Sequence, residues 1–415
     1  MAKLQQKGQA KHASRKSTDS GRSDLSSSGD DDADAIPEPS KSPNLAVPAG
    51  PQWAFLDPLL VSTGVLRDPR DTVFIKTIAW LLIGSASALY LVLGRWSWWH
   101  FAAHAAWVGR HATTFVLMLH CVCHRPLFAR HVHALNWIVP YVLAPFYGHT
   151  WDTFYFHHIK HHHIEDNGPH DLSSTLSYQR DSPLHFAIYF ARFFFLTVVE
   201  LPLYFYRKGW ASTAFRMLAM ESASWSMFAA LGYIGTHYTS STPDQAYLAA
   251  TMCFAVPVVL MRFGMMSGNW AQHAFVDTER PDCDYVQSLT CIDNEYNALA
   301  FNDGYHTSHH LNPRRHWADH PGNLVACADD YAKHGTLVFR GIDFHITWFH
   351  LMTKNYKALA TAYVHLDATA KRPSDDEIMR MLQGRVRRMS DDEIAAYYSK
   401  TGVKAAARRV PGSSQ

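Results

Sequence analysis

Three short histidine clusters constrain the fold of this chain more than any other feature. They are His120-x-x-x-His124, His158-x-x-His161-His162 and His306-x-x-His309-His310. Imidazole is the commonest metal ligand among side chains, and it must be neutral to bind. A closed zinc site uses four protein ligands and a catalytic zinc three, so eight histidines exceed the needs of one metal ion and suit two. The fold must therefore bring three distant segments together at one site.

The spacing inside each cluster predicts a helix. Residues three and four apart lie on the same face of an α-helix, so the histidines of each box should project together. Two adjacent histidines after a gap of two can reach two different metal ions from a single helical turn. We therefore predict that each box is a short helical segment facing a shared metal site.

The order of the three boxes resembles the membrane-bound fatty acid desaturase and hydroxylase superfamily, whose members hold two irons with histidines. Asn269-Trp-Ala-Gln-His273, between an apolar run and the third box, is similar to the Asn-x-x-x-His of the stearoyl-CoA desaturase branch. In that branch the histidine is a ninth ligand and the asparagine binds metal through water. Asn302-Asp-Gly-Tyr-His306 also looks like the branch's lead into its last box. The resemblance spans roughly residues 70–330 and implies a metal site of His120, His124, His158, His161, His162, Asn269, His273, His306, His309 and His310.

The second box allows two registers. The histidines at 157, 158, 161 and 162 fit both HxxHH and HxxxHH, and the second spacing is typical of alkane hydroxylases. We take the first register, so that His158 is a ligand while His157 and His163 lie outside the ligand set. The run from His161 to Thr175 is not a generic desaturase sequence and leaves room for a specialised branch, including the membrane decarboxylases that turn fatty acids into terminal alkenes.

Carboxylates should orient the ligating imidazoles, because metal-bound histidines usually donate their other ring N–H to an acceptor. Asp152, Glu165 and Asp303 lie close to the boxes in sequence and are the candidates for this role, with His157 as a further neighbour of the site.

Four long apolar runs predict membrane-spanning helices, since a span needs about 20 mostly apolar residues. The loop between the first two runs carries Trp96, Trp98 and Trp99, a residue type that gathers at membrane interfaces. The four runs are residues 72–94, 98–119, 214–235 and 246–268.

Two further apolar runs do not fit a simple span. Residues 134–147 contain two prolines and are too short, so we predict a re-entrant segment. Residues 186–206 are long enough but hold Arg192, Glu200 and Pro202, and we expect them to lie along the interface.

The boxes must lie on one side of the membrane to form one site, which requires an even number of spans between the second and third boxes. The loop 236–245 has no Lys or Arg, whereas the box side has several, so the positive-inside rule places the histidines and both termini in the cytosol. The sequence thus predicts an all-α integral membrane protein, of the endoplasmic reticulum. Four spans and a re-entrant or interfacial segment should be capped by a cytosolic helical domain that holds the di-iron site.

Composition divides the chain into three parts. Residues 1–50 are rich in Ser, Asp, Lys and Pro and should form a disordered cytosolic tail. Residues 51–345 are the membrane di-iron domain. Residues 346–415 should form C-terminal cytosolic helices and a tail, because Ser374-Asp-Asp-Glu377 and Ser390-Asp-Asp-Glu393 are capping boxes that start helices.

The resemblance implies an oxygen-dependent enzyme with two iron ions, acting on a fatty acyl chain in a lipid membrane and most simply inserting a double bond. Hydroxylation and oxidative decarboxylation to a terminal alkene are the alternatives with the same centre. An inactive membrane receptor or scaffold is the alternative of another class. The chain has no haem, flavin or iron–sulfur motif, so electrons should come from a separate cytochrome b5, or from a ferredoxin with its reductase. A net charge of +2 argues against a nucleic-acid partner.

Overall fold

The computed structural model describes residues 54–238 and 240–401; the tail predicted for residues 1–50 and the last residues, 402–415, lie outside this range. Helices dominate the described residues, and the long ones come in the first two thirds of the chain. They are α2 (Thr72–Leu93), α3 (Trp98–His124), α6 (Pro183–Arg207), α7 (Ala211–Tyr238) and a continuous run of α8 (Pro243–Ala250), η9 (Thr251–Ala255) and α9 (Val256–Gln272).

Shorter elements connect the long helices and follow them. Before α6 these are η3 (Ala54–Leu56), α1 (Asp57–Ser62), η4 (Pro69–Asp71), η5 (Arg130–Trp137), η6 (Ile138–Leu143), η7 (Ala144–Tyr147), α4 (Thr153–His157), η8 (His158–His162) and α5 (His163–Glu165). After α9 they are β1 (Thr290–Ile292), α10 (Glu295–Leu299), α11 (His306–Leu311), η10 (Trp317–Asp319), α12 (His320–Ala326), α13 (Ala328–His334), β2 (Val338–Arg340), α14 (Phe344–Met352), α15 (Tyr356–Ala362), β3 (Tyr363–Val364), α16 (Asp375–Arg385) and α17 (Asp391–Thr401).

Among the described residues, three helices are long and apolar enough to cross a membrane: Pro69–Leu93, Pro183–Arg207 and Pro243–Gln272. This differs from the predicted set. α3 and α7 form where spans were expected, but their charged and histidine side chains lower their mean hydropathy. α6, which we expected to lie along the interface, has the composition of a span. The two charges in its interior pair with each other, because Arg192 Nη2 lies 3.2 Å from Glu200 Oε1.

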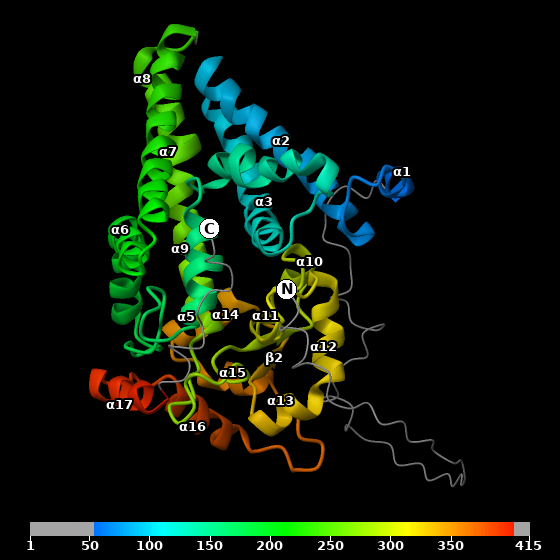
Figure 1. Cartoon of the computed structure of the whole chain (residues 1–415), viewed down its shortest axis with the longest axis vertical. Helices are drawn as coiled ribbons and strands as arrows, with labels where there is room; N and C mark the ends of the chain where they lie inside the picture. Colours follow the sequence, from blue (N-terminus) through cyan, green and yellow to red (C-terminus); the bar gives the residue numbers. More distant parts are fainter. Residues whose placement is uncertain (1–53, 239, 402–415) are drawn as a thin grey trace. The chain divides into compact units, whose positions relative to one another are not determined.

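The long helices pack closely through small residues. Figure 1 shows α7 and α8 side by side, with α2 packed against both. Ala88 and Leu91 of α2 share a buried apolar cluster with Phe228 of α7 and Phe254 of η9. A Cβ on Gly235 would lie 2.6 Å from a backbone oxygen of α2, so only glycine permits this approach.

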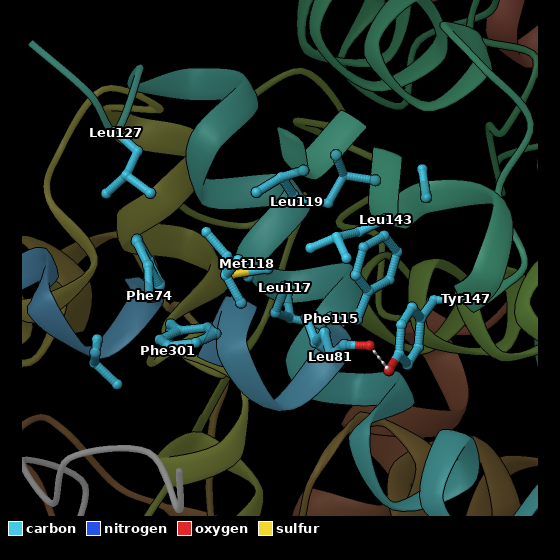
Figure 2. Packing of buried hydrophobic residues seen from close by; sticks show 14 of the residues in the cluster. Phe74, Leu81, Phe115, Leu117, Met118, Leu119, Leu127, Leu143, Tyr147 and Phe301 are labelled. Atoms are coloured by element: carbon cyan, nitrogen blue, oxygen red, sulfur yellow. Dashed lines mark hydrogen bonds between the residues drawn. The ribbon is translucent and has the colours of Figure 1, made fainter. Parts of the chain in front are cut away.

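A second apolar cluster holds the helix of the first box in place (Figure 2). Phe115 and Met118 of α3 pack on Phe74 of α2 and on Phe301, just before the third box. Tyr147 stacks on Phe115 and donates its hydroxyl hydrogen to the Leu81 carbonyl at 2.8 Å. Tyr147 ends the segment that we predicted to be re-entrant; there the chain forms three successive short helices, η5 to η7, rather than one long one.

The expectation of an all-α fold is wrong in one detail: β1, β2 and β3 form a small sheet in that order, β1 and β2 parallel and β2 and β3 antiparallel. Strands of two or three residues are too short to show the alternating pattern by which strands are recognised. The tryptophan belt is also only partly seen, since Trp98 and Trp99 are exposed but Trp96 is buried in the core.

The C-terminal helices belong to the same packed unit as the third box. The boundary expected between residues 345 and 346 falls inside α14, whose Phe344 and Leu351 pack with Ala271 near the end of α9 and with Leu382 of α16. Both expected capping boxes are present, at Ser374 for α16 and at Ser390 for α17.

Candidate metal centre

Five histidines from all three boxes converge in what we name the first histidine group. Each offers one ring nitrogen, and these nitrogens lie within 4.8 Å of one another. α3 supplies two of the rings, the η8–α5 segment supplies two and α11 supplies one. The members are His120, His124, His158, His163 and His309.

A second histidine group lies beside the first. His162, His273 and His310 also present nitrogens within 4.8 Å of one another, and all three are buried. His306 adjoins them, with its Nε2 atom 3.1 Å from Nε2 of His310. The two groups contact each other, because the rings of His163 and His310 are 5.1 Å apart between centroids.

The second box departs from the α-helical spacing on which the prediction rested. Residues 158–162 form a π-helical turn, whose hydrogen bonds join residues five apart rather than four. His158 and His163 are therefore brought together, with their Nε2 atoms 3.0 Å apart, and His162 is directed to the second group. His163, which we had left outside the ligand set, occupies the place expected for His161.

The first group cannot satisfy its own nitrogens by hydrogen bonding. Four Nε2 atoms lie in a row. Nε2 of His309 is 3.0 Å from Nε2 of His120 and 2.9 Å from Nε2 of His163. Nε2 of His163 is in turn 3.0 Å from Nε2 of His158. A neutral ring nitrogen carries one proton or one lone pair, so at most two of these three contacts can be hydrogen bonds. Nε2 of His124 is buried with no partner in the described part of the chain. A metal ion bound by the lone pairs would satisfy all five.

The spacing of these nitrogens also fits a metal ion. Two imidazole nitrogens at right angles around one ion, each at about 2.1 Å, lie about 3.0 Å apart. The residues present therefore suit a metal in the first group, and the second group has the same kind of donors.

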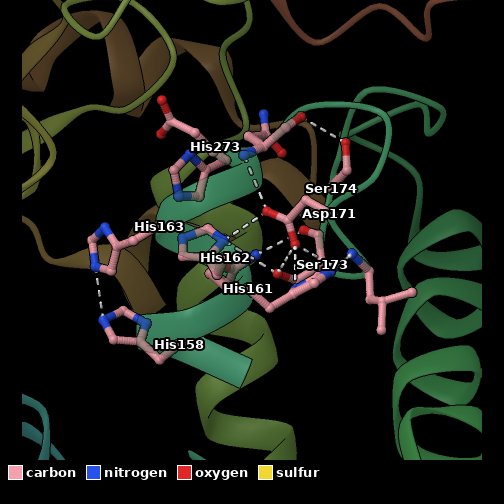
Figure 3. A network of polar contacts seen from close by, with 12 residues as sticks. His158, His161, His162, His163, Asp171, Ser173, Ser174 and His273 are labelled. Carbon is pink, nitrogen blue, oxygen red and sulfur yellow. Dashed lines mark hydrogen bonds and ion pairs between the residues drawn. The ribbon is translucent and has the colours of Figure 1, made fainter. Parts of the chain in front are cut away.

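Acceptors fix the orientation of the second group (Figure 3). Nδ1 of His162 donates to Asp171 Oδ2 at 2.7 Å, and Nδ1 of His310 donates to Asp166 Oδ1 at 2.9 Å. Nδ1 of His273 donates to the Gln287 carbonyl at 2.8 Å, which leaves its buried Nε2 without a partner among the described residues. In all three rings Nδ1 then carries the proton and Nε2 keeps a lone pair for a metal.

The orienting carboxylates are only partly those expected. Asp303 Oδ1 lies 3.4 Å from Nδ1 of His120 and 3.9 Å from Nδ1 of His306, and the second distance is too long for a hydrogen bond. Asp152 instead pairs with Arg216 and Tyr141, and Glu165 with Tyr204 and Lys208.

Asp166 and Asp171, which the sequence reading passed over, hold the rings instead. Asp166 has a left-handed backbone, with φ of 53°, which returns the chain toward the site. The sequence signal that could have identified it is Asp166-Asn167-Gly168 just after the second box, since these residue types favour turns and left-handed backbone.

His157 and His161 join neither of these two groups, but with Asp171 they form a third set of possible metal ligands, whose donor atoms lie within 4.8 Å of one another. Nε2 of His161 donates to the His170 carbonyl at 3.0 Å, and its Nδ1 lies 3.7 Å from Asp171 Oδ1. That carboxylate already accepts four hydrogen bonds, from His162, Ser173 (twice) and Asn167, so its lone pairs are used. Asp171 is therefore not free to bind a metal ion in the third set, although Nε2 of His157 and Nδ1 of His161 are buried with no hydrogen-bond partner among the described residues. Because two imidazoles alone are too few for a closed site, we assign the metal ions to the first and second groups.

The side chain of Asn269 lies one turn before His273, as the motif requires, but it is directed at neighbouring backbone. Its amide donates to the Ser173 carbonyl at 3.1 Å and to the Tyr189 hydroxyl at 2.7 Å. Asn269 lines the same cavity as His162 and His306. The structure thus brings His273 into the second group and places Asn269 beside it.

Burial keeps three rings of the first histidine group neutral. It lowers the pKa of His158, His163 and His309 well below the ordinary value, and the neighbouring imidazoles lower it further. Burial also opposes the charged form of His162, but the adjacent Asp171 carboxylate outweighs it and raises the pKa of His162. A bound metal ion would compete with that proton and accept the same lone pair.

Replacing Asp171 with asparagine should weaken metal binding by about 10- to 100-fold, the usual cost of losing an outer carboxylate on a metal-bound histidine. Glu165→Gln is the control, because Glu165 contacts Tyr204 and Lys208 instead of a ligand ring. Competition with a chelator, followed by iron analysis, measures the difference. Equal losses in both variants would show that Asp171 has no special part in holding the metal.

An elongated cavity of about 380 Å³ leads away from the histidines. One wall is α3, from Phe101 to His120, and the facing wall is the η9–α9 stretch from Met252 to Gln272. At 1.5 Å per residue, the α3 wall is about 28 Å long. Apolar residues prevail, including Met252, Met261, Met265, Met266, Val108, Val116 and Leu260.

Comparison with known proteins agrees with this geometry. The family model described as fatty acid desaturase matches residues 93–341, a stretch that contains all three boxes and His273. Neither the curated proteins nor the solved structures include a match to the chain. By the extent of the family match, which covers more than half of its length, the chain belongs to the fatty acid desaturase family.

Proposed function

We propose that this protein is an oxygen-dependent oxidoreductase that holds two iron ions in the two histidine groups and oxidises a fatty acyl chain, most simply by inserting a double bond. The observation that carries the proposal is the convergence of eight buried or partly buried histidines in two adjoining groups at one end of a long apolar cavity. The family, and three helices apolar enough to span a bilayer, indicate a membrane protein.

The donor set supports iron. Imidazole suits iron, zinc, copper and nickel, but zinc has no redox chemistry and could not serve an oxidation. Bound in the two groups, a pair of irons would supply the electron transfer and the open positions needed to use O2 against an unactivated C–H bond.

The protein's own residues position the substrate and the ligands. The α3 and α9 walls would hold an extended hydrocarbon chain away from water. Asp171 and Asp166 fix the ring orientations of His162 and His310, and Asp303 faces His120. Because burial lowers the pKa of His158, His163 and His309, these rings would keep their lone pairs at neutral pH.

One observation favours a second candidate. In the segment of the second box, the histidines that belong to the two histidine groups are His158, His162 and His163. Their HxxxHH spacing is typical of alkane hydroxylases. It supports hydroxylation or oxidative decarboxylation to a terminal alkene. The Asn269-x-x-x-His273 motif, with His273 in the second group, supports desaturation.

Product analysis separates these reactions. We expect yeast that expresses the chain to accumulate a fatty acid with an added double bond, seen by mass spectrometry with a His163→Ala strain as the blank. Hydroxy acids or terminal alkenes would establish the second candidate. An unchanged lipid profile from an iron-loaded protein with an active electron donor would contradict the proposal.

The remaining proposals concern the surroundings of the site. We infer a membrane of the endoplasmic reticulum, with four spans and the histidines on the cytosolic side. Electrons would come from cytochrome b5, or from a ferredoxin and its reductase. Of the basic residues near the boxes, Arg314 is exposed and available to an acidic partner, whereas Arg315 is engaged with Ser308 and Asn323.

A further inference from the structure

A buried ion pair interrupts the apolar wall of the cavity. Arg262 of α9 donates through Nη2 to Glu221 Oε1 of α7 at 2.9 Å, and the two side chains are only 13% and 9% exposed. Both residues lie within helices that we assign to the membrane. Charged groups are costly there and usually mark a functional site.

The oxygens of Glu221 are all engaged, whereas Arg262 keeps unused donors, although its guanidinium also lies over the Phe194 ring, 5.7 Å from the centroid. The carboxylate also accepts hydrogen bonds from Thr153 at 2.8 Å and from Trp225 at 2.9 Å. Beyond Glu221, Arg262 donates only a long bond of 3.4 Å from Nη2 to Thr150. Its Nε and Nη1 atoms have no hydrogen-bond partner within residues 54–238 and 240–401, and the side chain lines the cavity.

His149 provides a second unused polar group in the same wall. It is 4% exposed, it lines the cavity, and its Nε2 atom has no partner in the described part of the chain. It precedes Thr150, which Arg262 contacts, so Arg262, His149 and Thr150 form one polar patch. The remainder of the cavity wall near them, from Val256 to Met261, is apolar.

Arg262 lies well away from the second histidine group, whereas His149 is one ring removed from the first, since the Phe154 ring contacts both His149 and His158 at centroid distances of 5.6 and 5.2 Å. Arg262 precedes His273 by eleven residues on a nearly continuous helix, a separation of about 16 Å along its axis at 1.5 Å per residue. A group bound at Arg262 would therefore be several methylene groups from the carbon that reacts.

We propose that the polar patch binds the carboxyl group of a free fatty acid, whose hydrocarbon chain runs from there to the histidine groups. This inference rests on the proposed function. The carbonyl oxygen of the acid would accept from Arg262, and its hydroxyl would donate to Nε2 of His149. A neutral carboxylic acid suits the patch because Glu221 already balances the charge of Arg262. A carboxyl group held inside the helix bundle leaves no space for a carrier such as coenzyme A on the same carbon.

The test measures binding of radiolabelled lauric acid and of dodecane to the full-length, iron-loaded protein in lipid nanodiscs. Replacing Arg262 alone would leave Glu221 as an unpaired buried charge, so the deciding variant is the double replacement Arg262→Gln with Glu221→Gln. We expect it to weaken lauric acid binding about tenfold or more, the value of hydrogen bonds to a charged group, and to leave dodecane binding unchanged.

The single Glu221→Gln variant should change the affinity for the fatty acid in the opposite direction. It leaves Arg262 unbalanced and should tighten binding of the laurate anion. Lauric acid binding equal to wild type in the double variant would overturn the inference and assign the ion pair a purely structural part. Failure of the wild-type protein to bind either probe would instead contradict the proposed function.

Discussion

Replacing His163 with alanine should remove iron from the first histidine group and abolish turnover, whereas replacing His161 should leave most of the iron bound. His163 places its Nε2 atom 2.9 Å from that of His309 and 3.0 Å from that of His158. The ring of His161 is held outside both groups by the His170 carbonyl. The two residues differ by only two positions in one segment, so each variant is the control for the other.

Iron content and product formation, measured on both purified variants, show which of the two histidines binds the metal. The sequence alone predicts the reverse order, with His161 as the ligand in an HxxHH register. Loss of iron in His161→Ala together with retention in His163→Ala would show that the π-helical turn is not the arrangement that holds the metal.

Replacing Arg180 with alanine should lower the free energy of unfolding by at least about 3 kcal/mol, because several hydrogen bonds from a buried charge are lost at once. The side chain is fully buried and donates to carbonyl groups of three separate segments. The acceptors are Thr175, Leu176 and Tyr178 after the second box, Ala274 after α9, Arg385 at the end of α16 and Arg387 just beyond it.

The same variant should release iron from the second group, since Ala274 follows His273 directly and Thr175 donates to the His273 carbonyl at 2.6 Å. Arg280→Ala is the matched control: Arg280 is exposed and pairs with Asp277 three residues away, so its loss should cost within about 0.5 kcal/mol. Chemical denaturation in detergent, with iron assayed in parallel, measures both. A wild-type denaturation midpoint in Arg180→Ala would contradict this account of how the segments are joined.

The sequence identified the family and the three segments that meet at the metal site, because histidines at a fixed spacing can be recognised as metal ligands without a structure. It also located α2, α3, α7 and the α8–α9 run, although α3 and α7 are too polar to qualify as spans by composition. The charged residues of α6 argued against a span, because nothing in the sequence showed that Arg192 and Glu200 pair with each other.

The details of the site depend on local geometry that a helical repeat does not reveal. An α-helical spacing of the second box selects His161, while the π-helical turn selects His163. Asp171 reaches His162 only because the loop after the box folds back, so its role requires the tertiary structure. The polar patch at Arg262 was likewise invisible, because Glu221, Thr150 and Arg262 are distant in sequence.

The most direct test of the two-iron centre is the metal content of the purified protein. The full-length chain should be produced under iron-replete, anaerobic conditions and analysed by mass spectrometry for all transition metals. The two histidine groups predict about two irons per chain, falling in His163→Ala and in His273→Ala. One zinc and no iron per chain would contradict the account.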